Sequence, residues 1–549
     1  MAGAAALAAL RAAAHECQLA APSFSDEQAA HGLAITDELR AHFLLPATSA
    51  QAASPLLQLP AELMAVILSR LDTRDLARLA ATCRSLCRDA PIPPPPPRQI
   101  GPVETELRRR AEARGLDAGS SLPEGAPSWV ACLLERDRRD AQMRESPLAV
   151  GHEHSIFVDK GGRLLTCGCD LARTGTAPAH YVVDPDADPT IGREICTPTP
   201  VPSIQNRRIV SVATSFYHSL ALSTEGEVYS WGNGQFGALG HGDVAEKMRL
   251  SDSILPSRIE SLSRIERIAA GDWTSAAVDK NGRLFTWGRA SIEYTEEELD
   301  GEQEDFKGPS GLGYVLDAEA EYQLIPKRVD ALSQDRVVDV ALGEGFTLAV
   351  TDAGAVFSFG FSRDGALSHN SLESEVLPWR IEALVKTGRR LVAVAAGSCH
   401  ALALTEEGEL YGWGYKSDNG HGREERTPQL VAALIGQHVT FMHAQSTASC
   451  AVTEKGELFI WGDLNGWNIL HGEGSSQVTP KRVAGLSGVE VVAVAIGSTH
   501  TLAADADGVV WAFGRRSALG LGASGPEDSA IVPTPTPIPT LRVRVLNSP

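Results

Sequence analysis

The stretch that most constrains the fold of this chain contains three short apolar runs. The first is the β-branched, alternating run Ile209–Ala213, the second is His218–Leu222, and the third is Val228–Trp231. A Glu-Gly pair separates the second run from the third. Alternation with a period of two, interrupted by such a pair, predicts antiparallel strands joined by tight hairpins. Gly232 follows the third run and predicts a sharp bend or a close approach to another backbone.

The same pattern occurs seven times. Each copy ends its third run in an aromatic-Gly or Cys-Gly pair, at Cys167-Gly168, Trp231-Gly232, Trp287-Gly288, Phe359-Gly360, Trp413-Gly414, Trp461-Gly462 and Phe513-Gly514. A hairpin glycine precedes each pair, at Gly162, Gly226, Gly282, Gly354, Gly408, Gly456 and Gly508. Successive pairs are 48 to 72 residues apart. A period near fifty residues with about four short strands per unit is typical of a β-propeller, because a ring of sheets buries faces that one sheet leaves exposed. The predicted fold class is therefore mainly β.

Two further patterns concern the edges of these sheets. Most copies are followed by Pro and an apolar residue, at Pro256, Pro326, Pro378 and Pro480. This predicts a fourth, outer strand, because an unpaired edge tolerates Pro. Near the C-terminus, Leu541–Leu546 alternates cleanly, and we expect it to complete the sheet of the first blade and join the ends of the ring.

The repeats resemble those of the regulator of chromosome condensation family. The fifth copy carries the resemblance most fully, in Val394-Ala395-Ala396-Gly397, His400, Ala403-Leu404-Thr405, Gly408, Leu410-Tyr411 and Trp413-Gly414. The resemblance covers residues 149 to 540 and implies a seven-bladed propeller, in agreement with the count. Copies three, four and six depart from it, because Thr274, Phe346 and Ala448 replace the histidine.

A second informative segment, Leu57–Asp89, predicts two or three short helices. Apolar residues at helical spacing form two stripes, with Asp72 or Thr73 as the cap of the second helix. So small a unit buries little area alone and usually needs a partner. The segment resembles an F-box; the alternative is a plain helical hairpin packed on the propeller. The resemblance implies docking on the Skp-type adapter of a cullin complex, with these adapter-facing residues: Leu59, Pro60, Leu63, Ile67, Leu71, Leu76, Leu79 and Cys83.

Composition narrows the possible partners. The net charge of −20 opposes binding to nucleic acid or to anionic lipid, and no apolar run has the length of a membrane span. Nine scattered cysteines fit a reducing compartment, so we expect a cytoplasmic or nuclear protein.

The expected domains are an Ala-rich segment, disordered or partly helical (1–54), the F-box (55–90), a Pro-rich linker and helical spacer (91–145) and the propeller (146–549).

The residues do not predict an enzyme. His154, His218, His400 and His500 occupy one slot of separate repeats, and we expect each to hydrogen-bond backbone within its own blade. The cysteine spacings lack a second ligand pair, so no metal or cofactor is expected. The tryptophans at 231, 287, 413 and 461 are expected to be core residues of the repeat.

The third copy contains a long insertion, Ala290–Gln323, with an acidic run. The simpler interpretation is a solvated loop. The alternative is a contact for a basic partner, with Glu296, Glu297, Glu298 and Asp300 as the candidate substrate-binding residues.

Three functions follow from these resemblances. The first is a substrate-recognition subunit of an SCF-type ubiquitin ligase, with the F-box on the adapter and the propeller on a protein substrate. The second is a guanine-nucleotide exchange factor or regulator of a small GTPase, which requires a rim element that pries nucleotide from its partner. The third is a UV-B photoreceptor, but the Gly-Trp-Arg-His-Thr motif of that branch is absent. The F-box favours the first, because an exchange factor has no use for an adapter-docking helix pair.

Overall fold

The computed structural model describes residues 146–168, 195–242, 255–294, 306–316, 320–369, 373–415, 417–463, 477–522 and 531–545. The F-box-like segment and the acidic run of the insertion lie outside the described residues. Among the described residues, no helix has the length and apolar character needed to cross a membrane.

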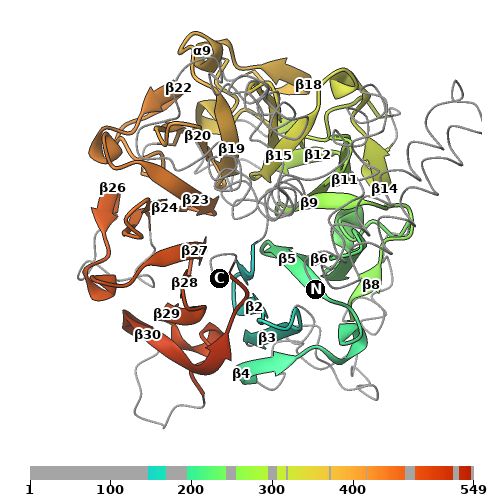
Figure 1. Ribbon diagram of the computed structural model, residues 1–549. Helices are drawn as coiled ribbons and strands as arrows, with labels where there is room; N and C mark the ends of the chain where they lie inside the picture. Colours follow the sequence, from blue (N-terminus) through green and yellow to red (C-terminus); the bar gives the residue numbers. More distant parts are fainter. Residues whose placement is uncertain are drawn as a thin grey trace, which may run out of the picture. The chain divides into compact units, whose positions relative to one another are not determined.

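Seven four-stranded antiparallel sheets follow one another around a ring, as predicted (Figure 1). In six of them the strands pair in sequence order, and the seventh takes its outer strand from beyond an inserted hairpin. Blade 1 contains β1 (Leu148–Val150), β2 (His154–Val158), β3 (Leu164–Gly168) and β4 (Ile195–Pro200). Blade 2 contains β5 (Ile209–Thr214), β6 (His218–Ser223), β7 (Val228–Gly232) and β8 (Ser257–Arg258). Blade 3 contains β9 (Ile265–Ala270), β10 (Thr274–Asp279), β11 (Leu284–Arg289) and β14 (Tyr322–Arg328).

The remaining blades have the same organisation. Blade 4 contains β15 (Val337–Leu342), β16 (Phe346–Thr351), β17 (Val356–Gly360) and β18 (Glu375–Arg380). Blade 5 contains β19 (Leu391–Ala396), β20 (His400–Thr405), β21 (Leu410–Gly414) and β22 (Glu425–Leu430). Blade 6 contains β23 (Val439–Gln445), β24 (Ala448–Thr453), β25 (Leu458–Gly462) and β26 (Gln477–Arg482). Blade 7 contains β27 (Val491–Ile496), β28 (His500–Asp505), β29 (Val509–Arg515) and β30 (Ile531–Arg542).

Short helical turns lie between the strands. They are α9 (Glu382–Val385) and the 3₁₀ turns η2 (Pro202–Ile204), η3 (Gln235–Gly237), η4 (Asp330–Leu332), η5 (Arg363–Gly365), η6 (Ala432–Leu434), η7 (Ala484–Leu486) and η8 (Arg516–Ala518). Blade 3 also carries an extra two-stranded hairpin, β12 (Ser291–Tyr294) paired with β13 (Phe306–Pro309). Among the described residues, it is the one sheet that does not form a blade.

The two glycine positions of the repeat have different physical roles. The hairpin glycine Gly226 has a φ of 78°, and its N–H donates to the carbonyl of Ser223. The glycine after the third strand, Gly232, has a φ of 110°, and a Cβ there would lie 2.8 Å from the Cα of His218. Both positions therefore require the left-handed backbone that glycine adopts without penalty. The predicted hairpin and the predicted close approach are confirmed.

The core lies between neighbouring blades rather than within one. At the junction of blades 1 and 2, Ile156, Val158, Ile209 and Trp231 form one apolar cluster and are each 0% exposed. The tryptophans at 231, 287, 413 and 461 are all fully buried, as predicted. Each removes roughly 200 Å² of ring surface from water, worth up to about 5 kcal/mol. Each blade therefore depends on its neighbours to bury its faces.

The C-terminal strand closes the ring in a way that refines the prediction. Most of it, β30, is the outer strand of blade 7, so Leu541 does not belong to the first blade. The next residue after β30, Val543, pairs with Asp159 of blade 1, and the N–H of Arg544 donates to the carbonyl of Val158. The N–H of Val543 also donates to the carbonyl of Gly508, just as the N–H of Ile209 donates to the hairpin glycine Gly162 and that of Ile265 to Gly226. The tail thus begins the inner strand of blade 1.

Candidate protein-interaction surface

The predicted adapter-facing residues cannot be placed, because Leu59, Pro60, Leu63, Ile67, Leu71, Leu76, Leu79 and Cys83 lie outside the described residues. The same holds for the candidate substrate-binding residues Glu296, Glu297, Glu298 and Asp300. Both assignments stay predictions. The described ring carries candidate sites of its own.

The repeated histidines join neighbouring blades, which corrects the expectation that they bond backbone within one blade. His218 of blade 2 lies 2.6 Å through Nε2 from the Ser275 hydroxyl of blade 3. His500 of blade 7 lies 2.8 Å from the Ser155 hydroxyl of blade 1, so the last blade and the first are joined like any other pair. The partner is 57 residues away in sequence for His218, and only assembly of the ring brings it into range.

The direction of these hydrogen bonds follows from the serine. The Ser275 hydroxyl donates to the carbonyl of Ala238, so its oxygen accepts from the Nε2–H of His218. A neutral imidazole with its proton on Nε2 makes this hydrogen bond. Burial lowers the pKa of His218 to about 4 and that of His500 to about 3. The histidines are therefore uncharged structural donors at neutral pH.

Where a blade lacks the histidine, the next blade lacks the serine that would face it. Thr274, Phe346 and Ala448 take the histidine position in blades 3, 4 and 6, and the serine position of the next blade then holds Thr347, Ala401 and Thr501. Every described junction with a histidine places a serine opposite it. The pair is thus one structural unit shared by two blades.

At the junction of blades 5 and 6, a serine, a histidine and an aspartate lie in a row, as in the catalytic triad of a hydrolase. The Ser449 hydroxyl lies 2.6 Å from His400 Nε2, and Asp418 Oδ2 lies 3.9 Å from His400 Nδ1. However, Ser449 is 0% exposed and its hydroxyl donates to the carbonyl of Asp418. A nucleophile needs access to substrate and a proton that its base can remove. This serine has neither, so the arrangement holds blades 5 and 6 together.

A chain of rings, the aromatic cluster, lies across blades 1 to 3. It consists of His152, Phe216, Tyr217, Trp273, Phe236 and Tyr322. Consecutive ring centroids are 4.3 to 5.8 Å apart, and Tyr217 stacks on Trp273 with an interplanar angle of 28°. Four of the six rings come from loops that join the first and second strands of a blade. Those loops share one end of the blades, so the cluster belongs to one face of the ring.

Charged groups accompany the aromatic cluster. The guanidinium of Arg289 lies 4.9 Å from the ring centroid of Phe236 and 5.5 Å from that of Trp273, within cation–π range. The partly buried Asp272 accepts a hydrogen bond from the N–H of Phe216 at 3.5 Å. Burial, and then the negative charge of Glu344, raise the pKa of Asp272 to about 6. This end of the surface is rich in carboxylate and aromatic groups.

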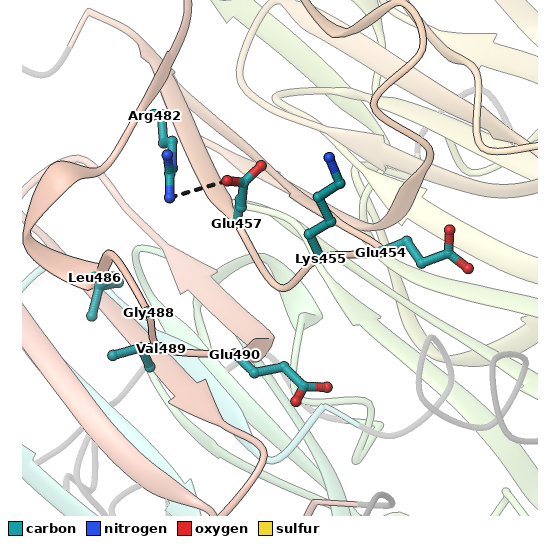
Figure 2. A pocket seen from close by; sticks show the side chains of 8 residues that line it. All are labelled: Glu454, Lys455, Glu457, Arg482, Leu486, Gly488, Val489 and Glu490. Atoms are coloured by element: carbon teal, nitrogen blue, oxygen red, sulfur yellow. Dashed lines mark ion pairs between the residues drawn. The ribbon is translucent and has the colours of Figure 1, made fainter.

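The opposite end of the blades carries a groove between blades 6 and 7 (Figure 2). Its volume is about 520 Å³, and it is lined by Glu454, Lys455, Glu457, Arg482, Leu486, Gly488, Val489 and Glu490. Most of these side chains are charged, whereas small-molecule sites are mainly apolar. Its Arg482–Glu457 ion pair, 3.0 Å long, recurs in blade 2 as Arg258–Glu227 at 3.1 Å. This ion pair is therefore a feature of the repeat rather than of one blade.

No group of three His, Cys, Asp or Glu side chains in the described ranges is arranged to hold a metal ion. The aromatic cluster was not found from the sequence. Its signal was the pair of residues before the histidine position, which is Phe216-Tyr217 in copy two and Asp272-Trp273 in copy three. An alignment of the seven copies would have shown the aromatic residues at that position, but not the ring contacts between blades.

Comparison with known families agrees with this geometry. The model of the regulator of chromosome condensation (RCC1) repeat matches residues 225–278, 353–404 and 455–504, and a second model of that repeat matches 209–238 and 391–423. An F-box-like model matches residues 56–90.

Three curated relatives illustrate the similarity. The human E3 ubiquitin-protein ligase HERC2 is 39% identical over 321 residues, which are 56% of this chain but 6% of HERC2. The ultraviolet-B receptor UVR8 of Arabidopsis thaliana is 34% identical over 40% of this chain and 44% of its own length. The mitochondrial RCC1 domain-containing protein RUG3 of the same plant is 29% identical over 68% of this chain and 82% of its own length. The chain thus spans less than half of the first two relatives.

Solved structures support the fold. A crystal structure of Kap60 bound to yeast RCC1 (Prp20) matches with a TM-score of 0.55 at 21% identity, over 74% of this chain and 86% of the matched one. Human WBSCR16 matches with a TM-score of 0.51 at 22% identity, over 66% and 86%.

Proposed function

Because the chain is an F-box protein with a seven-bladed propeller of RCC1 repeats, we propose that it is a substrate-recognition subunit of an SCF-type cullin-RING ubiquitin ligase. The F-box-like match at residues 56–90 carries this proposal. In it, the F-box docks on a Skp-type adapter, the propeller binds a protein substrate, and the chain supplies no catalytic residue. Such a subunit would act in the cytoplasm or the nucleus.

The structure of the ring suits this role. Its blades are held together by buried aromatic residues and by histidine–serine pairs, so its loops are displayed on a stiff frame. Loops on a rigid scaffold are the usual place for recognition. Human HERC2, which is 39% identical over 321 residues, is named an E3 ubiquitin-protein ligase.

Co-purification with a Skp-type adapter tests the proposal. We expect the wild-type chain to retain the adapter and a cullin, and Leu71→Asp or Leu76→Asp to lose both, because each puts a charge on a predicted apolar stripe. Arg78→Asp is the matched control, since Arg78 falls between the apolar positions and should leave the adapter bound. Unchanged capture by both leucine variants would refute the proposal. A leucine variant that keeps the propeller folded also serves to accumulate the substrate.

One observation favours the GTPase alternative. The hairpin β12–β13 is a separate two-stranded sheet inserted before the outer strand of blade 3, and an exchange factor requires an added element of this kind. Nucleotide release from a panel of small GTPases tests this directly. Acceleration by the wild-type chain that is lost on removal of residues 291–309 would establish this function instead.

A further inference from the structure

The aromatic cluster is not needed to build a blade. At the two positions before the histidine slot, blades 2 and 3 carry Phe216-Tyr217 and Asp272-Trp273. Blades 5, 6 and 7 carry Ser398-Cys399, Ser446-Thr447 and Ser498-Thr499 there. These three blades have the same four-stranded order as blade 2. The rings on blades 1 to 3 therefore need an explanation other than folding.

The backbone of Phe236 supports a specific use of this cluster. Phe236 has a φ of 65°, a left-handed conformation that is disfavoured for a bulky side chain. In blade 4 the corresponding residue before the loop glycine is Asp364, a residue type that tolerates this conformation far better, and its φ is 55°. A phenylalanine is thus held at a position that favours Gly, Asn or Asp. Strain of this kind is concentrated at functional sites.

The cluster is also accessible at one end. Phe216 is 36% exposed, although its ring contacts those of His152 and Tyr217. The buried faces of the blades are already filled by the core tryptophans, so Phe216 adds surface rather than core. Exposed aromatic rings beside polar groups are typical of the anchors of protein interfaces.

Charge indicates what this surface binds. The carboxylate of Asp272 accepts a hydrogen bond from the backbone N–H of Phe216, and the negative charge of Glu344 in the next blade acts on the same carboxylate. At the other end of the cluster, the guanidinium of Arg289 lies over Phe236 and Trp273, which demonstrates that these rings accept a cation. Arg289 also leads into the hairpin whose connecting residues 295–305 include seven acids.

We propose that the aromatic cluster, with the Asp272 and Glu344 carboxylates, binds Lys or Arg side chains of an extended segment in a protein partner. A cation over Phe216 would be attracted both by the face of the ring and by the neighbouring carboxylates. This inference deepens the proposed function, since it names the chemical class of the segment that the propeller would recognise.

Fluorescence anisotropy with two labelled peptides tests it. One peptide repeats the unit Gly-Lys-Ser-Arg, and the other repeats Gly-Gln-Ser-Gln. Both are titrated with the purified full chain at about 0.15 M salt, where long-range attraction is screened. We expect the cationic peptide to bind and the Gln peptide to bind at least about tenfold more weakly.

Variants distinguish binding at this surface from non-specific electrostatic attraction to an acidic protein. Asp272→Asn with Glu344→Gln should weaken binding about tenfold or more, and Phe216→Ser should weaken it about three- to thirtyfold. Glu454→Gln with Glu490→Gln removes the same charge at the opposite end of the blades and should change binding less than about twofold. Melting temperatures close to that of the wild type confirm that each variant is folded.

Two results would overturn the proposal. Equal weakening by the two double variants would mean non-specific attraction, and unchanged binding by Phe216→Ser would remove the aromatic contribution. Failure of the adapter test would leave these measurements intact, because the peptides contact only the ring. Failure here would equally leave the adapter interaction standing.

Discussion

The histidine–serine pair between blades predicts a compensating double substitution. Blade 4 carries Phe346 at the histidine position, packed in one cluster with Ala401 of blade 5. The next junction carries His400 and Ser449. A Cβ at Gly397 would overlap the His400 ring, as one at Gly343 would overlap the Phe346 ring, so the two sites have the same shape. His400→Phe with Ser449→Ala therefore converts one natural junction into the other.

The single variants should each destabilise the ring. His400→Phe deprives the buried Ser449 oxygen of its donor, and Ser449→Ala deprives the His400 N–H of its acceptor, at a cost of about 1–3 kcal/mol each. The propeller unit, Ala141–Pro549, has roughly 400 residues, and at about 2.1 cal/mol/K per residue a loss of about 1 kcal/mol lowers the melting temperature by about 1 °C.

We therefore expect each single variant to melt about 1–4 °C lower, and the double variant to recover at least about half of the larger loss. Calorimetry at one scan rate measures all four proteins. If the two losses simply add in the double variant, the side chains are not coupled and the pairing argument is wrong.

Three further predictions concern ring closure, the hairpin glycines and pH. Removal of residues 540–549 should lower the melting temperature by several degrees, because strand contacts between the last and first blades are lost, whereas removal of 546–549 alone should not. Gly226→Ala should destabilise the protein more than Gly436→Ala. The φ angles are nearly equal, 78° at Gly226 and 77° at Gly436, but only a Cβ at Gly226 would meet backbone of the next blade, at 2.9 Å. Equal losses of unfolding free energy in chemical denaturation would contradict this. Burial raises the pKa of Asp418 from 3.8 to about 7, so the folded state keeps a proton that the unfolded chain releases, and stability falls as pH rises through this window. Asp418→Asn should gain melting temperature relative to the wild type between pH 5 and pH 8, and a constant difference would refute the assignment.

The architecture was predictable because its determinants are local. The turn at Gly226 and the bend at Gly232 are set by residues within a few positions of each other, and the same signals recur in all seven copies. The proline-marked outer strands follow from the missing N–H of proline in the same way. The F-box-like segment was recognisable for a similar reason, since its apolar stripes repeat at helical spacing within one short segment.

The candidate surface was not predictable because it exists only after the ring has closed. His152 and Tyr322 are the two ends of one chain of ring contacts, although a whole blade separates them in sequence. The partner of His218 was likewise assigned to the wrong blade, because the sequence of one repeat does not specify how its sheet aligns with the neighbouring sheet. Contacts between repeats follow from ring geometry, whereas contacts within a repeat follow from sequence.

This distinction also indicates where function resides in the ring. Residues that occur in most copies, such as the core tryptophans and the histidine–serine pairs, are explained by the need of each blade to bury its faces against the next. Among the described residues, the features that this need does not explain include the rings on blades 1 to 3, the strained Phe236 and the hairpin β12–β13. Arg289 connects all three, since it lies over Phe236 and only Ala290 separates it from the hairpin. A partner that contacts the ring there would meet the features that the repeat does not require, and for that reason this sector of the ring is where a substrate should first be sought.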